Sequence, residues 1–473
     1  MTKIQLMFPQ GGSRLSSSGV IPPLGILALA TSLKQTNPEL NIELYDGEAQ
    51  TDLVSKLNGD ILGLSTTGTN YYHSLELAQA AKAKGMKVII GGPHATAKHR
   101  AILRNQPDID VAVRSEGEDS LPTIIQALLE ERPELLTGLS NVTYRKDGTI
   151  ISNPGIPKCM QPSLDRHPLP DYSLLGELND LYAEAFEEHA YREQGYTMFR
   201  AIESQKGCAK TEREKDYRCT FCCRVDYGLR RLSPQRFWET VAASTDPAGK
   251  AMIWDMSDSF TGRVGLSDLW MQQVLEARPQ DLEEIVGFKI FARSDEIDIE
   301  TIRLLTELNV QEVFIGAESG SQAQLDAANK GSTPAQNMQA VRYLKDAGIT
   351  TYLSFVYGLP GESAQSLEQT YQHTEDLLRN GMIAGLGYRI LWPLAGCIDH
   401  QRLIKTMREH GSTKLADEIV DSDWEDSLHL QHLWIEHMTR TSVDEITQYH
   451  LRMMDLASKY DVKINDEKRL MFE

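Results

Sequence analysis

Four of the six cysteines in this chain lie in one short stretch, GCAKTEREKDYRCTFCC, at residues 207–223. Three of them, Cys208, Cys219 and Cys222, have the spacing C-x10-C-x2-C. Thiolates suit iron–sulfur chemistry, so this trio predicts a [4Fe–4S] cluster whose fourth iron stays open to a small molecule. A structural zinc site would need four ligands, and no histidine lies nearby to complete one beside Cys223. Zinc and a chance cluster of buried thiols remain the alternatives.

The stretch resembles the cluster loop of radical S-adenosylmethionine (radical SAM) enzymes. Their usual form is C-x3-C-x-aromatic-C, with Phe221 at the aromatic position. Here ten residues, 209–218, separate the first two cysteines instead of three, and the extra residues fall in Ala209–Asp216. Loop closure becomes only slowly more costly with length, so the insertion is compatible with a site. The resemblance implies that Cys208, Cys219 and Cys222 ligate the cluster and that SAM binds its open iron.

Length and composition describe a multidomain globular protein. A chain of 473 residues predicts two or three domains, and 41% apolar with 24% charged residues is typical of soluble proteins. The chain has no apolar run long enough for a membrane span, and its start lacks the features of a signal peptide. The few, clustered cysteines favour a reducing cytoplasm. A net charge of −19 argues against nucleic acid as a partner.

Residues 1–135 alternate between strand-like and helical patterns. Strands are expected at Lys3–Pro9, Asn41–Tyr45, Asp60–Ser65, Lys87–Ile90 and Asp110–Val113. Such alternation predicts an α/β domain with a doubly wound, Rossmann-like parallel sheet, whose ligands bind at the carboxyl ends of strands. The candidate residues there are Ser65, Thr66, Thr67, Gly91, Gly92, His94, Glu116 and Gly117. Glycine would let a bulky ligand approach the backbone, and ordinary turn chemistry is the alternative.

Three stretches of this domain, PPLGILALA, IIGGPHATA and RSEGEDSLP, resemble the cobalamin-binding domain that precedes the radical domain in one large radical SAM subfamily. The resemblance implies a bound corrinoid with its lower base displaced, contacted by the residues just named. His94, expected in a loop, is the candidate for a polar contact, with a purely structural histidine as the alternative. No histidine precedes His73, so the axial-imidazole motif Asp-x-His-x-x-Gly is missing from the first loop. A cobalamin-type fold that binds nothing therefore stays open.

Residues 136–196 predict a connection between two domains. Strand-like runs flank Asp147-Gly148 within Asn141–Asn153, which is a strong hairpin signal. The proline-rich residues 154–170 indicate a linker, and Leu178–Glu193 has a helical pattern. Cys159, alone in the linker, is interpreted as structural or incidental.

Residues 197–396 repeat strand and helix. Strands are expected at Met198–Ser204, Met252–Asp255, Phe288–Ala292, Glu312–Ala317, Thr351–Val356 and Gly385–Leu391. The first is expected to lead straight into the cysteine loop. Six such units predict a partial (β/α)6 barrel, the fold of radical SAM enzymes, with its chemistry at the carboxyl ends of the strands.

Further motifs of the same family suggest contacts to SAM. IGAESGSQAQLDAANKG resembles the fourth-strand signature, which implies that Glu318, next to Ser319, reaches the ribose or amino-acid part of SAM. FVYGLPGES resembles the fifth-strand turn, where Gly358 permits a tight bend. MIWDMSDSFTG resembles the second-strand motif, with Asp258 as receiver of the methionine amine. Arg293 suits the methionine carboxylate, and a salt bridge at the barrel rim is its alternative.

Residues 397–473 are helical in pattern. Helices are expected at Gln401–Glu409, Trp434–Thr439 and Val443–Lys459, as a cap that covers the barrel mouth and shapes the substrate pocket. His429 and His432 would share a helix face, and solvated histidines are a better interpretation than a metal site.

Together these resemblances imply a cobalamin-dependent radical SAM enzyme. Reductive cleavage of SAM at the cluster would yield a 5′-deoxyadenosyl radical, and methylcobalamin would methylate an unactivated carbon of a small molecule or natural-product intermediate. A flavodoxin- or ferredoxin-type protein would donate electrons. A radical cyclase, oxidase or rearrangement enzyme without methyl transfer is the first alternative. A non-catalytic Fe–S or corrinoid sensor is the second.

Overall fold

A computed structural model describes residues 2–11, 21–156, 161–213, 218–223, 228–246, 248–265, 268–424 and 426–464; Cys159 lies outside them. The chain divides into two compact units. The first contains Met1–Ile202, Glu239–Ala251 and Asp421–Trp424, and the second contains Glu203–Trp238, Met252–Val420 and Glu425–Glu473. In the described part of the chain, no helix is both long and apolar enough to cross a membrane.

The first unit is built on a seven-stranded sheet with the order β2-β1-β3-β4-β5-β6-β7. Its parallel part comprises β1 (Lys3–Phe8), β2 (Asn41–Asp46), β3 (Ile61–Ser65), β4 (Lys87–Gly91) and β5 (Val111–Val113). All five strands were predicted from the sequence. The strand order reverses between β1 and β3, which makes the carboxyl ends there a topological switch point.

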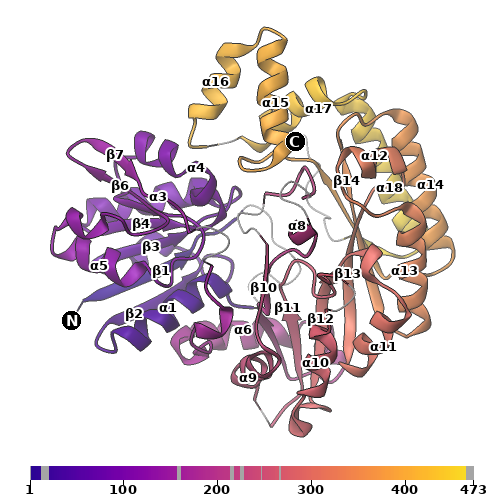
Figure 1. Ribbon diagram of the computed structural model, residues 1–473, viewed down its shortest axis with the longest axis horizontal. Coiled ribbons are helices and arrows are strands. Elements are labelled where there is room, and N and C mark those ends of the chain that lie inside the picture. Colours follow the sequence, from indigo (N-terminus) through magenta and orange to yellow (C-terminus); the bar gives the residue numbers. More distant parts are fainter. Residues whose placement is uncertain are drawn as a thin grey trace. The chain divides into compact units, whose positions relative to one another are not determined.

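Helices cover both faces of this sheet (Figure 1). Helices α1 (Leu24–Thr36) and α5 (Leu121–Leu129) form one core with the sheet, while α2 (Leu53–Lys56), α3 (Tyr71–Ala83) and α4 (Gly92–Asn105) form the other. Alternate residues of β3 explain the two cores, because Ile61 packs in the first and Leu62 and Leu64 pack in the second. The predicted doubly wound arrangement is confirmed.

The predicted hairpin is present as β6 (Val142–Lys146) and β7 (Thr149–Ser152), which pair antiparallel and extend the sheet beyond β5. Asp147 and Gly148 both have positive φ, 48° and 73°, as a two-residue turn of this kind requires. The single helix predicted over 178–193 is interrupted. Its first part is α6 (Leu178–Glu187), and its second part is the short α7 (Ala190–Glu193). His189 caps α7 by accepting the Tyr191 N–H.

A second seven-stranded sheet has the order β16-β15-β14-β13-β12-β11-β8. Its strands are β8 (Met198–Ile202), β11 (Ala251–Asp255), β12 (Val286–Ala292), β13 (Val310–Glu318), β14 (Thr350–Tyr357), β15 (Gly385–Ile390) and β16 (Lys463–Ile464). The pairs from β12 to β16 are parallel. The intervening helices include α9 (Pro234–Ser244), α10 (Trp270–Glu276), α11 (Ile299–Glu307), α13 (Pro334–Asp346) and α14 (Ala364–Arg379). The six predicted strands are confirmed; β16 was not predicted.

The C-terminal part of the chain is helical, as predicted. It forms α15 (Ile398–Glu409), α16 (Thr413–Asp421), α17 (Ser427–Met438) and α18 (Val443–Lys459). Helix α18 packs against α14, and α15 packs against α17. A capping box of Ser442 and Glu445 starts α18 by satisfying two backbone N–H groups at its first turn.

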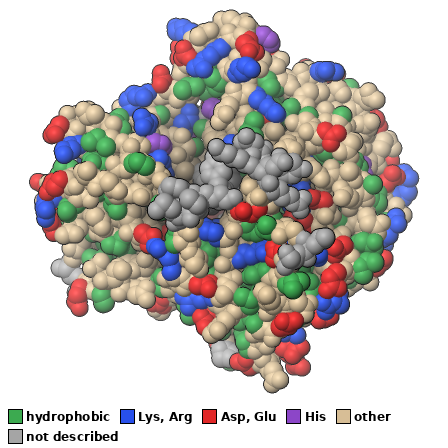
Figure 2. All heavy atoms as spheres, in the orientation of Figure 1, with side chains coloured by type: hydrophobic (Ala, Val, Ile, Leu, Met, Phe, Trp, Pro, Cys, Tyr) green, Lys and Arg blue, Asp and Glu red, His purple; other side chains and the backbone are tan. Residues whose placement is uncertain are grey.

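Charged side chains of both signs are interspersed on the face that Figure 2 shows, rather than gathered into one basic patch. Many form pairs along or between helices, for example Arg303 with Glu300 and Glu307. Exposed pairs of this kind each contribute less than about 1 kcal/mol to stability.

Candidate active site

The cysteine loop begins and ends in a small antiparallel ribbon of β9 (Gln205–Gly207) and β10 (Leu229–Arg231). The sequence had predicted one strand running straight into the loop, but β8 ends at Ile202 and the ribbon follows. Gly207 has a φ of 90°, and a Cβ there would overlap the Gly228 carbonyl oxygen. Only glycine allows the ribbon to close, and the Cys208 N–H then donates to that same oxygen at 3.0 Å.

Cys219 and Cys222 lie in one turn, in which the Cys222 N–H donates to the Cys219 carbonyl at 3.2 Å. Cys208, Cys219 and Cys222 have intermediate exposure and form no disulfide among the described residues. Burial raises the pKa of the Cys208 thiol. The Lys210 backbone N–H and Arg293 act to lower this pKa, but burial outweighs them. Among described residues, no three His, Cys, Asp or Glu side chains surround one point as a single ion requires. A [4Fe–4S] cluster instead takes one thiolate per iron, and this donor set fits it.

The cysteine loop is fastened to the segment 328–331, which follows helix α12 (Gln322–Ala327). Three successive carbonyl oxygens of this segment accept hydrogen bonds from three other parts of the chain. Ala328 accepts from the Thr220 N–H (2.9 Å), Asn329 from the Lys210 ammonium, and Lys330 from the Arg293 guanidinium (2.7 Å). The segment therefore joins the two later cysteines, the inserted residues and the end of β12.

The same segment places the Lys330 ammonium 2.6 Å from Glu318 Oε1 at the carboxyl end of β13. A bulge lies between Gly316 and Glu318, and Glu318 has a φ of 61°. Gly316 leaves the room that the two side chains occupy, since a Cβ there would overlap the Glu318 carboxylate. Burial acts to lower the pKa of Lys330, but Glu318 and Cys219 outweigh it, so the pKa is raised. Lys330 is a site residue that the sequence analysis did not single out.

Arg293 forms the rim salt bridge that was the alternative interpretation of this residue. Its guanidinium pairs with Asp295 at 2.9 Å and with Glu296 at 3.7 Å. Burial acts to lower the pKa of Arg293, but Asp295, Cys219 and Glu296 outweigh it and raise the pKa above its ordinary value. Arg293 is thus held by two carboxylates while it donates to the Lys330 carbonyl.

Asp255 ends β11 and Asp258 follows it, and the two aspartates differ in burial. Asp255 is fully buried, and its Oδ1 accepts from the Ser257 N–H (3.0 Å) and from the Ser204 N–H (3.4 Å), just ahead of the cysteine loop. Burial raises the pKa of the Asp255 carboxyl group. Asp258, predicted to receive the methionine amine, is exposed. Asp255 therefore positions the chain that leads to Cys208, which sequence reasoning had not assigned to it.

Of the remaining SAM candidates, Ser319 and Gly358 lie at the same end of the strands, and Phe221 lies in the cysteine loop. Ser319 is buried and shares a hydrogen bond of 3.0 Å with Thr370, within the turn after β13. Gly358 has a φ of 75°, and its carbonyl accepts from the Trp434 indole N–H. Phe221 is half-buried. Ser319 and Gly358 thus shape turns, whereas Phe221 is partly exposed.

Thr220 links the cysteine loop to the start of α15. Its hydroxyl donates to Asp399 Oδ2 at 2.8 Å, and the Asp399 N–H donates back to the Thr220 carbonyl at 3.0 Å. Asp399 is fully buried, and Arg402 donates to its other oxygen at 3.1 Å. Burial raises the pKa of the Asp399 carboxyl group, although Thr220 and Arg402 act to lower it. Asp399 is a second positioning residue that the sequence did not reveal.

In the first unit, the candidate cobalamin residues gather at the carboxyl edge of the parallel strands. The Thr66 N–H and hydroxyl both donate to the Gly91 carbonyl at 2.8 Å. Gly92 has a φ of 91°, and a Cβ there would lie 2.5 Å from the Thr66 carbonyl oxygen. Ser65 and Thr67 flank Thr66. The edge is therefore built from closely packed backbone, in which Gly92 lies against Thr66.

Glu116 and Gly117 follow β5 at the same edge. Gly117 packs closely on α1, because a Cβ there would lie 3.3 Å from Leu29 Cδ2. This edge thus brings together loops that follow three neighbouring strands.

His94 lies in the first turn of α4 and not in a loop, which corrects the prediction. Its side chain is buried, and its Nε2 forms a hydrogen bond of 2.8 Å with the Asp423 carbonyl. Its ring also packs on Tyr71, with centroids 4.2 Å apart. The Asp423 carboxylate in turn accepts from Tyr71 (2.7 Å), Asn105 (2.9 Å) and Gln106 (2.7 Å). His94 thus belongs to a buried network that holds the segment 421–424.

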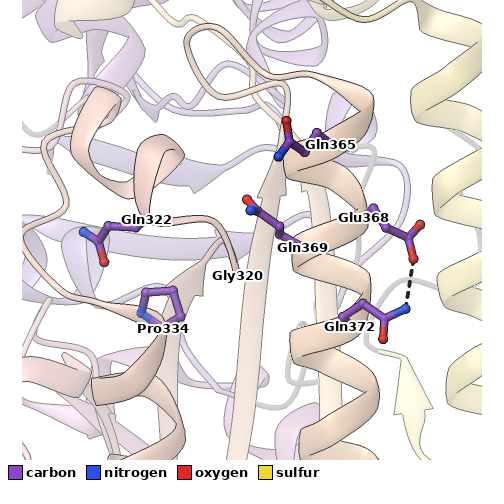
Figure 3. A pocket seen from close by; sticks show the side chains of 7 residues that line it. All are labelled: Gly320, Gln322, Pro334, Gln365, Glu368, Gln369 and Gln372. Atoms are coloured by element: carbon purple, nitrogen blue, oxygen red, sulfur yellow. Dashed lines mark hydrogen bonds between the residues drawn. The ribbon is translucent and has the colours of Figure 1, made fainter.

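A groove of about 610 Å³ lies between α14 and the segment that runs from the end of β13 to the start of α13 (Figure 3). It is lined by Gly320, Gln322, Pro334, Gln365, Glu368, Gln369 and Gln372. Glu368 and Gln372 hydrogen bond to each other at 2.9 Å across one helical turn. None of the predicted site residues lines this groove, so it is separate from the cysteine loop.

Comparison with known proteins agrees with this geometry. A model of the B12 binding domain matches residues 14–125, and a model of the radical SAM superfamily matches residues 216–374. This chain is a radical SAM protein with an N-terminal B12-binding domain. The radical SAM match contains Cys219, Cys222 and Glu318, whereas Cys208 precedes it.

Curated relatives of this radical SAM protein include an uncharacterized methyltransferase of Pyrococcus horikoshii, 26% identical over 75% of this chain and 73% of the relative. They also include an anaerobic magnesium-protoporphyrin IX monomethyl ester cyclase of Cereibacter sphaeroides, 24% identical over 78% of this chain and 58% of the cyclase. The structure of the cobalamin-dependent SAM radical enzyme OxsB with aqua-cobalamin is similar, with a TM-score of 0.69 at 16% identity over 97% of this chain and 67% of that one. At this identity the likeness shows a shared fold.

Proposed function

We propose that this protein is a cobalamin-dependent radical SAM methyltransferase that methylates an unactivated carbon of a small molecule or natural-product intermediate. One observation carries the proposal. Three cysteines, Cys208, Cys219 and Cys222, lie in a loop fastened to the segment that presents the Glu318–Lys330 pair, in a chain that also has a B12-binding domain. The methyltransferase name of a relative that matches three quarters of the chain supports this reaction over others.

When bound, these cofactors would supply an electron, a 5′-deoxyadenosyl radical and a methyl group for the reaction. The chain's own residues bind and orient. Cys208, Cys219 and Cys222 would hold the irons, and Glu318, kept in place by Lys330, would accept hydrogen bonds from the ribose or ammonium of SAM. Asp258 would take the methionine amine, while Phe221, Ser319 and Gly358 would border the nucleoside. Arg293 would act through Lys330, as a positioning residue.

Cobalamin would lie against the edge formed by Ser65–Thr67, Gly91, Gly92 and the Glu116-Gly117 turn. The lack of a side chain at Gly92, whose backbone packs on Thr66, supports a flat macrocycle at this edge. We place His94 behind this edge, because its Nε2 is engaged by the Asp423 carbonyl. His94 would then support the edge without ligating cobalt.

A second candidate is a radical cyclase, oxidase or rearrangement enzyme without methyl transfer. The similarity to a magnesium-protoporphyrin cyclase over 78% of this chain supports this second candidate. In either case the substrate would be a small molecule, electrons would come from a flavodoxin- or ferredoxin-type donor, and the protein would work in the cytoplasm.

The test is anaerobic purification with cobalamin supplied, followed by reconstitution and counts of iron, sulfide and corrinoid. Cys219→Ala should abolish the cluster absorbance, whereas Cys223→Ala should keep it, because Cys223 is the neighbouring thiol that the proposal leaves outside the cluster. A full cluster in Cys219→Ala would overturn the ligand assignment.

Incubation with SAM and a reductant should then release 5′-deoxyadenosine. With SAM carrying a labelled methyl group, transfer of the label to candidate substrates supports the methyltransferase. Production of 5′-deoxyadenosine with an unmethylated, cyclised or oxidised product supports the second candidate. A loaded protein that never cleaves SAM would contradict both.

A further inference from the structure

The residues inserted between Cys208 and Cys219 begin with a short helix, α8 (Lys210–Arg213). The Lys210 side chain turns inward and keeps only 5% of its surface exposed. A lysine this buried is uncommon, because taking an ammonium group out of water costs free energy unless polar groups receive it. The position of Lys210 therefore needs a physical reason.

Among the described residues, a sulfur and a carbonyl oxygen accept from the Lys210 ammonium. Its Nζ lies 3.8 Å from Cys219 Sγ, and it donates to the Asn329 carbonyl. The Gly331 position adjoins it, because a Cβ there would lie 3.5 Å from Nζ. Lys210 thus bridges a predicted cluster ligand and the segment that carries Lys330.

Cys219 lies within a larger group of positive charges. Besides Lys210, the Arg293 guanidinium and the Lys330 ammonium interact electrostatically with the Cys219 thiolate. Arg293 is held by Asp295 and Glu296, and Lys330 is held by Glu318. The hydrogen-bond contact to the sulfur, as far as the described residues show, comes from Lys210.

We propose that helix α8 delivers Lys210 to Cys219, where its ammonium raises the reduction potential of the [4Fe–4S] cluster. This inference rests on the proposed function. A reduced cluster carries one more negative charge than the oxidised cluster, so a nearby buried cation favours reduction. Hydrogen bonds to the ligand sulfur act in the same direction, because they withdraw electron density from it. Lys210 thus acts on electron transfer, as a positioning residue.

The experiment is a redox titration of the anaerobically reconstituted holoenzyme, followed by the EPR signal of the reduced cluster. Lys210→Met keeps the length of the side chain and removes its charge, while Lys210→Arg keeps the charge. Lys345→Met is the control for net charge, since Lys345 lies on α13 and donates to the Asn380 carbonyl. Iron and sulfide contents are measured first, so that only fully loaded variants are compared.

Lys210→Met should lower the ratio of reduced to oxidised cluster at least about tenfold at a fixed solution potential, a shift of about 59 mV for one electron. Lys210→Arg and Lys345→Met should stay close to the wild type. An unchanged potential in fully loaded Lys210→Met would overturn the proposal. Failure of both Lys210→Met and Lys210→Gln to load a cluster would also overturn it, because Lys210 would then be a structural brace of the loop.

These outcomes are separate from failure of the proposed function. If the wild-type protein binds no [4Fe–4S] cluster, the function itself is wrong. If the wild type binds a cluster and cleaves SAM while the potential of Lys210→Met is unmoved, only the role of Lys210 is wrong.

Discussion

The Lys330 ammonium lies 2.6 Å from the Glu318 carboxylate, and each of the two side chains keeps only 8% of its surface exposed. Removal of one partner from a buried ion pair strands the other charge and costs about 3–5 kcal/mol. The pair also gives Glu318 a defined orientation at the carboxyl end of β13, where the motif predicts contact with SAM. A substitution of Glu318 should therefore change both stability and SAM binding, and a matched control variant separates the two effects.

Glu318→Ala should keep the cluster, lower the melting temperature and weaken SAM binding about tenfold or more. Glu312 provides the control, because it forms a similar buried pair with Lys289 (2.7 Å) at an earlier position of the same strand. Glu312→Ala should lower the melting temperature to a similar degree and leave SAM affinity unchanged. Calorimetric titration with SAM and thermal denaturation check both. Equal SAM affinities in the two variants would refute the role of Glu318.

The reciprocal contact between Thr220 and Asp399 should determine how firmly the cluster is held. Asp399→Ala leaves the Thr220 hydroxyl and Arg402 without their acceptor, which costs about 1–3 kcal/mol. We expect lower iron and sulfide content after reconstitution and faster loss of iron to a chelator. Thr220→Val should behave similarly, whereas Thr220→Ser, which keeps the hydroxyl, should resemble the wild type. Normal iron retention in Asp399→Ala would show that the brace is dispensable.

Gly92→Ala should impair cobalamin binding through the backbone. A Cβ at this position meets the Thr66 carbonyl at 2.5 Å, and the φ of 91° disfavours alanine by about 1–2 kcal/mol. Gly85 is the control, since its φ is also positive (81°) but nothing lies within 4 Å of its added Cβ. Both variants should be less stable, but only Gly92→Ala should lose hydroxocobalamin affinity in an absorbance titration, by about tenfold. Equal affinities would place the corrinoid elsewhere.

Glu362 should make stability fall as pH rises. It is 1% exposed in the turn after β14, and burial raises its pKa to about 7, although Ser366 and backbone N–H groups act to lower it. Above pH 4.5 the unfolded chain releases a proton that the folded protein keeps until about pH 7. Glu362 therefore contributes its full stabilisation below the pKa of the unfolded chain. This contribution is lost as pH rises through the pKa of the folded protein, and the free energy of unfolding falls by on the order of 3 kcal/mol.

Glu362→Gln mimics the protonated side chain, so its melting temperature should rise relative to wild type between about pH 5 and pH 8. Glu368→Gln is the control, because hydrogen bonds from Gln372, Tyr449 and Arg452 lower the pKa of Glu368 to about 2. Its stabilising contribution is lost only at lower pH, so its difference from wild type should stay constant in this range. A constant difference for Glu362→Gln as well would show that Glu362 is ionised throughout.

Local patterns predicted most of the architecture. The apolar run Lys3–Pro9 corresponds to an observed strand, since the burial of a strand on both faces requires consecutive apolar residues. Phe288–Ala292 also corresponds to a strand, in which buried and partly exposed residues alternate. The Asp147-Gly148 turn was predictable for the same reason, because positive φ favours these residue types. The helix predicted over 178–193 was too long because the cap at His189 interrupts it through a side-chain contact.

The sequence by itself determined the cysteine trio, the order of strands and helices, and the residue types of the carboxyl ends, because each depends on neighbours along the chain. Only the tertiary structure decided what holds the site together. Thr220 meets Asp399 across 179 residues, and His94 meets the Asp423 carbonyl across 329. Such contacts leave no periodicity and no motif in the sequence. They arise because buried polar groups must find partners wherever folding brings them.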